Sequence, residues 1–87
     1  MDKIIKISVI ICTFNRSKLL IESLRAITRQ NFASDQYEII VVDNNSTDDT
    51  HDVVQMFSLM SPVIVRYVFE PRQGLSYARN TGIQSAT

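Results

Sequence analysis

Residues 37–49 read Tyr-Glu-Ile-Ile-Val-Val-Asp-Asn-Asn-Ser-Thr-Asp-Asp, and this stretch already shows the pattern that the rest of the chain repeats. Residues 37–42 form a short run rich in Ile and Val, which indicates a β-strand. Residues 43–45, Asp-Asn-Asn, follow at once and favour a turn, because their short polar side chains hydrogen-bond to nearby backbone. The stretch therefore predicts a strand that stops at a polar turn.

The residues after this turn predict a helix. Ser46 or Thr47 can cap its first turn. Asp48 and Asp49 fall within that turn, where the helix dipole favours acidic side chains. Pro62 ends the helix, because proline disfavours helical backbone in the residue before it. The apolar side of this helix consists of Val53, Val54, Phe57 and Leu59 or Met60.

The same alternation continues on both sides. Residues 4–12 form an almost continuous run of Ile and Val and predict a strand that is buried on both faces. Ser17 can then cap a helix. Residues 63–69 predict a third strand, and residues 75–86 predict a last helix. The first helix takes its apolar residues from positions at roughly helical spacing: Leu19, Leu20, Leu24, Ile27 and Phe32.

The order strand, helix, strand, helix, strand, helix predicts a mainly parallel sheet with right-handed crossovers. This corresponds to a three-layer α/β/α half-fold within a single partial domain over residues 1–87. In such sheets, ligands bind at the carboxyl ends of the strands. The distinctive polar residues gather at those ends: Thr13, Asn15 and Arg16 after the first strand, Asp43 to Ser46 after the second, and Arg72 to Arg79 after the third.

Composition excludes several classes of protein. The chain carries nine basic and nine acidic residues, so its formal net charge is zero. This balance gives no electrostatic footprint for nucleic acid or for an anionic membrane. Hydrophobic residues make up 45% of the chain, which is enough for a packed core. No apolar run approaches the roughly 18 residues that a membrane span needs.

The single cysteine, Cys12, bears on the compartment. It cannot form an internal disulfide, and it lies within an apolar run, so we interpret it as a buried thiol in a reducing compartment. Residues 1–6 lack the layout of a signal peptide. We therefore expect a cytoplasmic chain, and we leave open a parent protein at the cytoplasmic face of a membrane.

Common nucleotide motifs are missing from the sequence. No G-x-G-x-x-G follows the first strand, which argues against a Rossmann dinucleotide site, and no G-x-x-x-x-G-K-[ST] marks a P-loop. A phospho-acceptor module of the flavodoxin-like kind would need acidic residues at the ends of the first and third strands. Those ends carry Cys12-Thr13 and Phe69-Glu70, so this alternative is weak.

Four polar residues have both a functional and a structural interpretation. Asp43 could accept a ring N–H from a nucleobase, or it could hold a turn that leads into the next helix. Arg72 and Arg79 flank a small-residue turn at a helix start, where an arginine fork beside free backbone N–H groups suits phosphate. They could equally be solvated surface arginines. His51, the only histidine, is expected to be an exposed helix residue.

Three segments together resemble a known family. They are residues 8–16 (Ser-Val-Ile-Ile-Cys-Thr-Phe-Asn-Arg), 39–48 (Ile-Ile-Val-Val-Asp-Asn-Asn-Ser-Thr-Asp) and 74–82 (Gly-Leu-Ser-Tyr-Ala-Arg-Asn-Thr-Gly). In this order and at about this spacing, they are similar to the family 2 glycosyltransferases, which are inverting enzymes with a GT-A type nucleotide-diphospho-sugar fold. Each segment alone is moderately specific, and the three in register are highly specific. The resemblance covers nearly the whole chain.

The resemblance implies a nucleotide-binding role for particular residues. The acid that matches Asp43 hydrogen-bonds the base, usually uracil, and the arginine that matches Arg79 lies by the nucleotide. The glycine that matches Gly74 lets the backbone come close to the base. The loop that begins at Cys12 packs against base and ribose. The full set of expected nucleotide-binding residues is Cys12, Thr13, Phe14, Asn15, Asp43, Arg72, Gly74 and Arg79.

The sequence departs from the family pattern at two of these positions. Cys12 stands where many members have proline, and cysteine looks like a tolerated variant. Arg72 stands where asparagine is frequent, which puts the contact with the base edge in doubt and places another positive charge near the nucleotide.

The family pattern also contains residues that this sequence does not. Members continue with a fourth strand that ends in an Asp-x-Asp type motif for a divalent metal, and later supply an acidic catalytic base. Residues 1–87 contain neither, so we expect no catalytic and no metal-binding residue in this chain. The resemblance implies that the parent is an inverting enzyme that transfers a sugar from a UDP-type donor and needs Mn or Mg. The isolated chain is expected to be inactive.

Two further expectations follow from the same pattern. The alternative to a piece of a glycosyltransferase is a stand-alone nucleotide-binding or protein-interaction module with the same half-fold. In the GT-A arrangement that the resemblance implies, the first strand is central and its second neighbour comes from a part outside residues 1–87, so the strand at residues 4–12 is expected to expose an Ile- and Val-rich edge. Such an edge pairs readily with another chain, so we expect a homo-oligomer.

Overall fold

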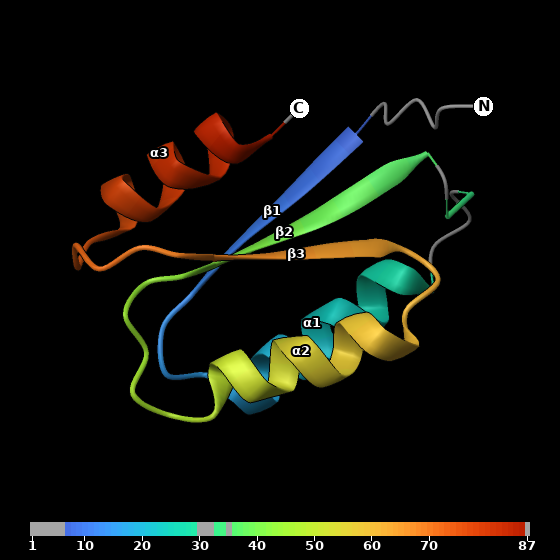
Figure 1. Ribbon diagram of the computed structural model, residues 1–87, viewed down its shortest axis with the longest axis horizontal. Coiled ribbons are helices and arrows are strands. Elements are labelled where there is room, and N and C mark those ends of the chain that lie inside the picture. Colours follow the sequence, from blue (N-terminus) through green and yellow to red (C-terminus); the bar gives the residue numbers. More distant parts are fainter. Residues whose placement is uncertain (1–6, 30–32, 35, 87) are drawn as a thin grey trace.

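The computed structural model describes residues 7–29, 33, 34 and 36–86, and its elements follow the predicted order (Figure 1). Within this part of the chain, none of the helices has the length and apolar character that a membrane crossing requires. Residues 4–6 and Phe32, which we assigned to the first strand and first helix, lie outside the described residues. The elements are β1 (Ile7–Thr13), α1 (Ser17–Thr28), β2 (Tyr37–Asp43), α2 (Thr50–Met60), β3 (Ile64–Phe69) and α3 (Leu75–Ser85).

The three strands form one sheet in the order β1-β2-β3, and they run parallel, as predicted. All seven residues of the middle strand, β2, are buried. The first strand, β1, was predicted to be buried on both faces, but Ile7 is exposed and residues 8–12 are only half-buried, because β1 has a neighbour on one side among the described residues. The register pairs Thr13 with Asp43 and Asp43 with Phe69, so the carboxyl ends of the three strands are level. The loops that leave these ends therefore start from one edge of the sheet. Among the described residues, β1 pairs with β2 only and keeps its other edge open.

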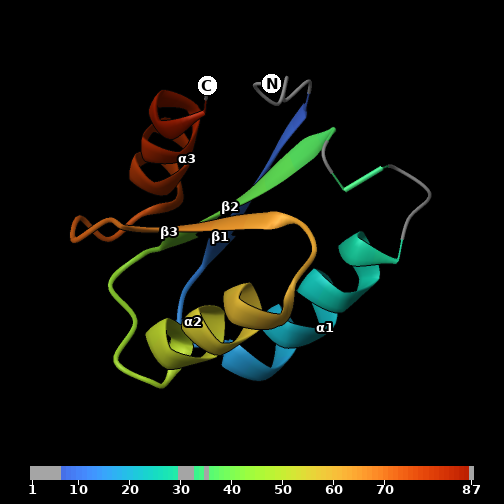
Figure 2. The same cartoon turned by 45° about the vertical axis from the view of Figure 1, so that its right-hand side comes forward.

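Helices cover both faces of the sheet and complete the three layers. Figures 1 and 2 show α1 and α2 below the sheet and α3 above it. Side chains of β2 alternate between the two faces, as they do along any strand. Ile39 and Val41 pack with Leu24 of α1 and Val54 of α2. On the other face, Ile40 and Val42 pack with Ala78 of α3.

Gly82 allows α3 to lie close to the sheet. A Cβ atom at this position would come within 2.4 Å of Cγ2 of Ile10 and 3.2 Å of Cγ2 of Val42. Contacts nearer than about 3.0 Å essentially never occur for a real Cβ. The helix α3 therefore packs against β1 and β2 through Ala78 and Gly82. This packing sets the position of its first turn relative to the ends of the strands.

The charged residue inside β2 has partners on both neighbouring strands. Glu38 is 2% exposed, and its carboxylate accepts hydrogen bonds from the hydroxyl of Ser8 at 2.7 Å and from the guanidinium of Arg66 at 3.2 Å. Arg66 also donates to the carbonyl oxygen of Ser85 at 2.8 Å. This network satisfies a charge that the apolar character of the strand would otherwise exclude, because a buried charge is costly unless it is paired.

The predicted helix caps were wrong. Ser17 is the first residue of α1, and Arg16 takes the cap position without a side-chain hydrogen bond. The next helix begins at Thr50, so neither Ser46 nor Thr47 caps it, and Asp49 is its cap residue rather than part of its first turn.

Instead, Asp48 serves both helix starts. Its carboxylate accepts the backbone N–H of Ser17 at 3.3 Å and that of Thr50 at 3.1 Å, and the Thr50 hydroxyl donates to it as well. The Thr50 hydrogen bonds hold the pKa of Asp48 below its ordinary value. N–H groups at the starts of both helices thus donate to the same carboxylate, and the dipoles of both helices stabilise its negative charge. This partnership joins residues 31 positions apart, which explains why local cap patterns missed it.

Candidate functional site

The three loops at the carboxyl ends of the strands lie together at one edge of the sheet, on the left in Figure 1. A hollow of about 280 Å³ opens between the end of β1 and the start of α3. Its lining includes four of the eight residues that we expected to bind a nucleotide, namely Cys12, Thr13, Phe14 and Gly74. The remaining lining residues are Asn44, Gln73, Leu75 and Ala78.

A second hollow, of about 390 Å³, adjoins the first and shares Cys12 and Leu75 with it. Arg79 and Ile83 line it from α3, and Ile10 lines it from β1. The two hollows together form a shallow trough along the side of α3. The trough therefore brings together five of the predicted site residues, with Arg79 at the far end.

Arg79 is exposed, and no described residue forms a hydrogen bond or ion pair with its guanidinium. Its positive charge lowers the pKa of the nearby Cys12 thiol, but burial outweighs this effect and raises that pKa above the ordinary value. The thiol is therefore neutral at pH 7, and Cys12 is half-buried, where we had expected a buried thiol. Arg79 keeps its fork available for an anion in the trough.

Gly74 lies where the third loop enters α3, and its backbone has an unusual conformation. Its φ of 137° lies in a region that residues with a Cβ rarely adopt, so glycine is required here. Gly74 takes the cap position of α3, so the backbone N–H groups of the first helical turn face the strand-end edge. This glycine was predicted from the resemblance, and the backbone provides the physical reason for it.

Asp43 is almost wholly buried, with 2% of its surface exposed, and both of its carboxylate oxygens have partners. Oδ1 accepts the backbone N–H of Ser46 at 2.9 Å, and Oδ2 accepts the hydroxyl of Tyr67 at 2.6 Å. The turn-holding interpretation of Asp43 is therefore confirmed. Each carboxylate oxygen can accept a second hydrogen bond, so a contact with a base is compatible with this arrangement and stays a prediction.

Asn15 links the first loop to the second. Its φ of 48° is left-handed, a conformation that asparagine tolerates better than most residues. Its side-chain oxygen accepts the backbone N–H groups of Thr47 at 2.7 Å and Asp48 at 3.3 Å, and its own N–H donates to the hydroxyl of Ser46 at 2.9 Å. The nucleotide contact expected of Asn15 stays a prediction. What its side chain does in this structure is join two loops.

Arg72 binds another protein residue rather than facing the trough. Its guanidinium forms two hydrogen bonds of 3.0 Å to the carboxylate of Glu70, and its Cζ lies 4.6 Å from the centre of the Tyr77 ring. The Thr81 hydroxyl of α3 also donates to Glu70. These bonds, those of Arg72 first, lower the pKa of Glu70 to about 2. The positive charge that we expected near the nucleotide is thus paired with a buried carboxylate.

Tyr67, which reaches Asp43 from β3, and Glu70 also contribute polar groups here, and sequence reasoning gave neither a role in the site. Asn44 was expected only as part of the turn after β2. His51 is exposed on α2, as expected, and its ring packs edge-on against Tyr67 with 4.7 Å between ring centres. Within the described ranges, no group of three or more His, Cys, Asp or Glu side chains is arranged to hold a metal ion. We therefore assign no metal ligand to this part of the chain.

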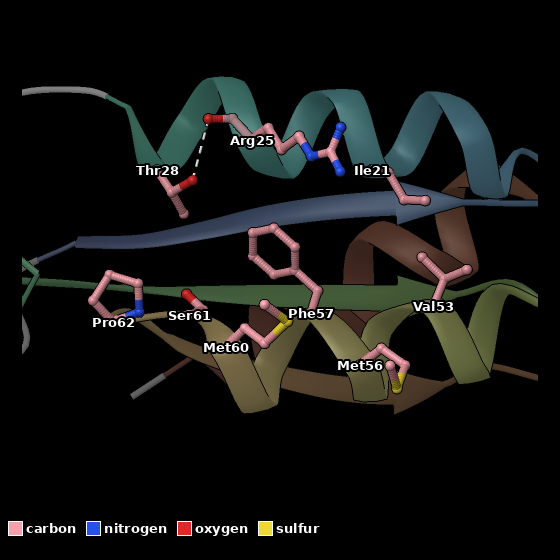
Figure 3. A pocket seen from close by; sticks show the side chains of 9 residues that line it. All are labelled: Ile21, Arg25, Thr28, Val53, Met56, Phe57, Met60, Ser61 and Pro62. Atoms are coloured by element: carbon pink, nitrogen blue, oxygen red, sulfur yellow. Dashed lines mark hydrogen bonds between the residues drawn. The ribbon is translucent and has the colours of Figure 1, made fainter.

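A more apolar groove lies elsewhere, between α1 and α2 (Figure 3). In Figure 3 the Phe57 ring points from α2 toward α1, and the Arg25 side chain extends along α1. Among the described residues that line the groove, Arg25 alone is charged, and none is one of the eight predicted residues. It does not lie at the carboxyl ends of the strands, so we place the candidate site in the trough beside α3.

Comparison with known proteins identifies the family. The geometry describes a parallel α/β unit with a candidate site at its strand ends. The family model for glycosyl transferase family 2 matches residues 8–87, and the chain belongs to this family. It is 35% identical over 81 residues to the glycosyltransferase AglE of Haloferax volcanii, which covers 93% of this chain and 27% of that protein. It is 39% identical over 83 residues to the GalNAc(5)-diNAcBac-PP-undecaprenol beta-1,3-glucosyltransferase of Campylobacter jejuni, covering 94% and 26%.

Solved structures agree on the fold, which is that of the GT-A glycosyltransferases. The mannosyltransferase PcManGT of Pyrobaculum calidifontis, in complex with GDP-Man and Mn2+, matches with a TM-score of 0.88 and 33% identity over 94% of this chain and 24% of that one. TarS 1-349 of S. aureus, in complex with UDP-GlcNAc, matches with a TM-score of 0.81 and 28% identity over 95% and 24%. The chain spans about a quarter of the length of the first of the curated relatives that it matches.

Proposed function

We propose that this chain supplies the nucleotide-binding part of an inverting glycosyltransferase that takes its sugar from a UDP-type donor. One observation carries the proposal: Thr13, Phe14 and Gly74 line one hollow, and Thr13 pairs in the sheet with Asp43, which lies beside the hollow and is not among its lining residues. Family membership supports it, as do the nucleotide sugars bound in PcManGT and TarS.

The proposed roles follow from the chemistry of each group. Asp43 is fixed by two donors and offers its remaining lone pairs to a base N–H. The half-exposed ring of Phe14 offers an apolar surface for base or ribose. Arg79 and the first N–H groups of α3 offer positive charge to the diphosphate. Uracil and guanine both carry a ring N–H, so Asp43 alone does not discriminate between them, and the choice of UDP rests on the family resemblance.

The chemical step belongs to residues that we have not found in this chain. Inverting transfer needs a base for the acceptor hydroxyl and stabilisation of the diphosphate leaving group. We infer that the whole protein obtains a divalent cation, Mn or Mg, through an acidic motif outside residues 1–87. The 87-residue chain by itself should release no UDP from a UDP-sugar above background, with or without manganese. The cytoplasmic location expected from Cys12 remains part of this proposal.

A chemical-shift titration with UDP, uridine and GDP tests the location of the site. UDP should shift the backbone resonances of Thr13, Phe14 and Gly74 and leave those of Val53 and Phe57, in the α1/α2 groove, unchanged. Arg79→Ala should weaken UDP more than uridine, because the arginine is assigned to phosphate. Arg25→Ala makes the same change in the other groove and should bind UDP like the wild type. Equal weakening by both arginine variants would contradict the assignment, since it would indicate a general charge effect.

A further inference from the structure

Asn44 connects the end of β1 with the loop between β3 and α3, whereas the sequence predicted only that it belongs to the turn after the second strand. It is 7% exposed. Its backbone N–H donates to the carbonyl oxygen of Thr13 at 2.9 Å, which ties it to the end of β1. Its other bonds all reach the loop between β3 and α3: Nδ2 donates to the carbonyl oxygens of Glu70 at 3.2 Å and Arg72 at 2.7 Å, Oδ1 accepts the N–H of Gly74 at 3.0 Å, and its carbonyl oxygen accepts Nε2 of Gln73 at 2.7 Å.

These bonds connect opposite walls of the nucleotide hollow. Thr13 forms one wall and Gly74 the other, and Asn44 lies between them and lines the hollow itself. The Gly74 N–H has its bond to the side chain of Asn44, so the strained backbone at φ 137° is anchored there. We propose that Asn44 is a positioning residue, which sets the distance between the two walls and thereby the fit of the nucleotide. The second half of this proposal rests on the proposed function.

The loop needs an amide at this position. It presents two carbonyl oxygens, of Glu70 and Arg72, and one N–H group, of Gly74, to the same side chain. An amide offers two donor hydrogens and an acceptor on one planar group. An aspartate keeps the acceptor for Gly74 but turns the donor into a second oxygen, which would face two carbonyl oxygens. The change from Asn44 to Asp therefore keeps the size of the side chain and its acceptor for Gly74, and replaces its donor by an acceptor.

The anchoring can be measured without any ligand. In Asn44→Ala, the Gly74 amide should exchange with solvent at least about tenfold faster than in the wild type, because its acceptor is removed. Amides of Ile40 and Val41, in the middle of the buried strand, report overall unfolding. If their exchange accelerates by the same factor as that of Gly74, Asn44 stabilises the whole fold and does not position the loop. That result would overturn the proposal.

Ligand binding tests the consequence for the site. Asn44→Asp should weaken UDP and uridine by a similar factor, about tenfold or more, because a wall of the hollow moves rather than a phosphate contact. Asn80→Asp makes the same chemical change at an exposed position of α3 and should leave both affinities within about twofold of the wild type. Folded Asn44→Asp protein that binds both ligands as tightly as the wild type would refute the positioning role.

The two proposals fail in different ways. If the wild type binds neither UDP nor uridine, the proposed function is wrong, while exchange at Gly74 still decides whether Asn44 fixes the loop. If the wild type binds UDP and the Gly74 amide stays protected in Asn44→Ala, the proposed function stands and the role of Asn44 is refuted.

Discussion

The hydroxyl of Tyr67 donates a 2.6 Å hydrogen bond to Oδ2 of Asp43, from the middle of β3 to the end of the neighbouring β2. Burial, and then the carboxylate itself, raises the pKa of Tyr67 above its ordinary value. The phenol is therefore protonated across the neutral range and remains a donor. We propose that Asp43 contacts the base. Tyr67, a residue inside the sheet, thus holds one of its two carboxylate oxygens in place.

The bond from Tyr67 predicts a loss of stability in Tyr67→Phe. The substitution leaves one oxygen of a buried carboxylate without its donor, and a hydrogen bond to a charged group contributes roughly 1.5–3 kcal/mol. The free energy of unfolding, measured with urea, should fall by an amount in that range. Tyr77→Phe is the matched control, because the Tyr77 ring packs under Arg72 and phenylalanine keeps the ring. Equal stability of the two variants would show that the Tyr67 hydroxyl contributes nothing.

The contacts of Glu70 predict that the fold becomes less stable in acid. Its hydrogen bonds from Arg72 and Thr81 lower its pKa from an ordinary 4.5 to about 2 in the folded chain. Between these values the unfolded chain binds more protons than the folded one, so stability rises with pH. The contribution is complete above about pH 4.5 and is lost as the pH falls toward 2. Unfolding measured between pH 2 and pH 6 should show this slope, and Glu70→Gln should reduce it.

Glu22→Gln provides the control for that experiment. It makes the same chemical change at an exposed position of α1, away from the strand ends. A slope that is reduced equally in both variants would show that net charge, and not the contacts of Glu70, sets the acid sensitivity.

The fold was largely predictable, because strands and helices leave strong local patterns. The apolar runs fixed the number, order and type of the elements, and Pro62 marked the end of α2 at Met60. Helix starts were less predictable. The carboxylate of Asp48 accepts the first N–H group of α1 from a position 31 residues further along the chain, and no local pattern contains that information.

The site was only partly predictable. The motif residues Cys12, Thr13, Phe14 and Gly74 do line one hollow. Arg72 was expected near the nucleotide, but its fork pairs with Glu70, a partner only two residues away that the motif does not mention. The sequence reveals which residues are polar at the strand ends, while the choice of partner depends on how three loops meet in space.

The close contact at Gly82 predicts that a larger residue there displaces α3 and lowers stability. In Gly82→Ala the new Cβ would lie 2.4 Å from Cγ2 of Ile10, so the helix must shift, at a cost of about 1–3 kcal/mol. Asn80→Ala, at an exposed position of the same helix, should not destabilise the fold. Adding Ile10→Ala should relieve the clash, so the double variant should lose less stability than the sum of the two single changes. Additive losses would mean that the close contact at Ile10 is not the cause.

The open edge of β1 predicts self-association. Among the described residues, Ile7–Thr13 pairs with β2 only, and an unpaired edge of this kind offers backbone donors and acceptors to another chain. Light scattering over a range of concentrations should show a dimer or larger assembly of the 87-residue chain. A monomer at the highest concentration would contradict this prediction.

The comparison of Asp43→Ala with Tyr67→Phe tests the central claim most directly. Both variants break the same buried hydrogen bond, but only the first removes the carboxylate assigned to the base. Wild-type binding is expected to be weak, and millimolar affinity corresponds to only about −4 kcal/mol. In a chemical-shift titration with UDP on folded protein, Asp43→Ala should show no binding at concentrations that saturate the wild type, and Tyr67→Phe should still bind. If Asp43→Ala binds UDP like the wild type, or if UDP shifts no resonance near Thr13, Asp43 or Arg79, the proposed nucleotide site is wrong.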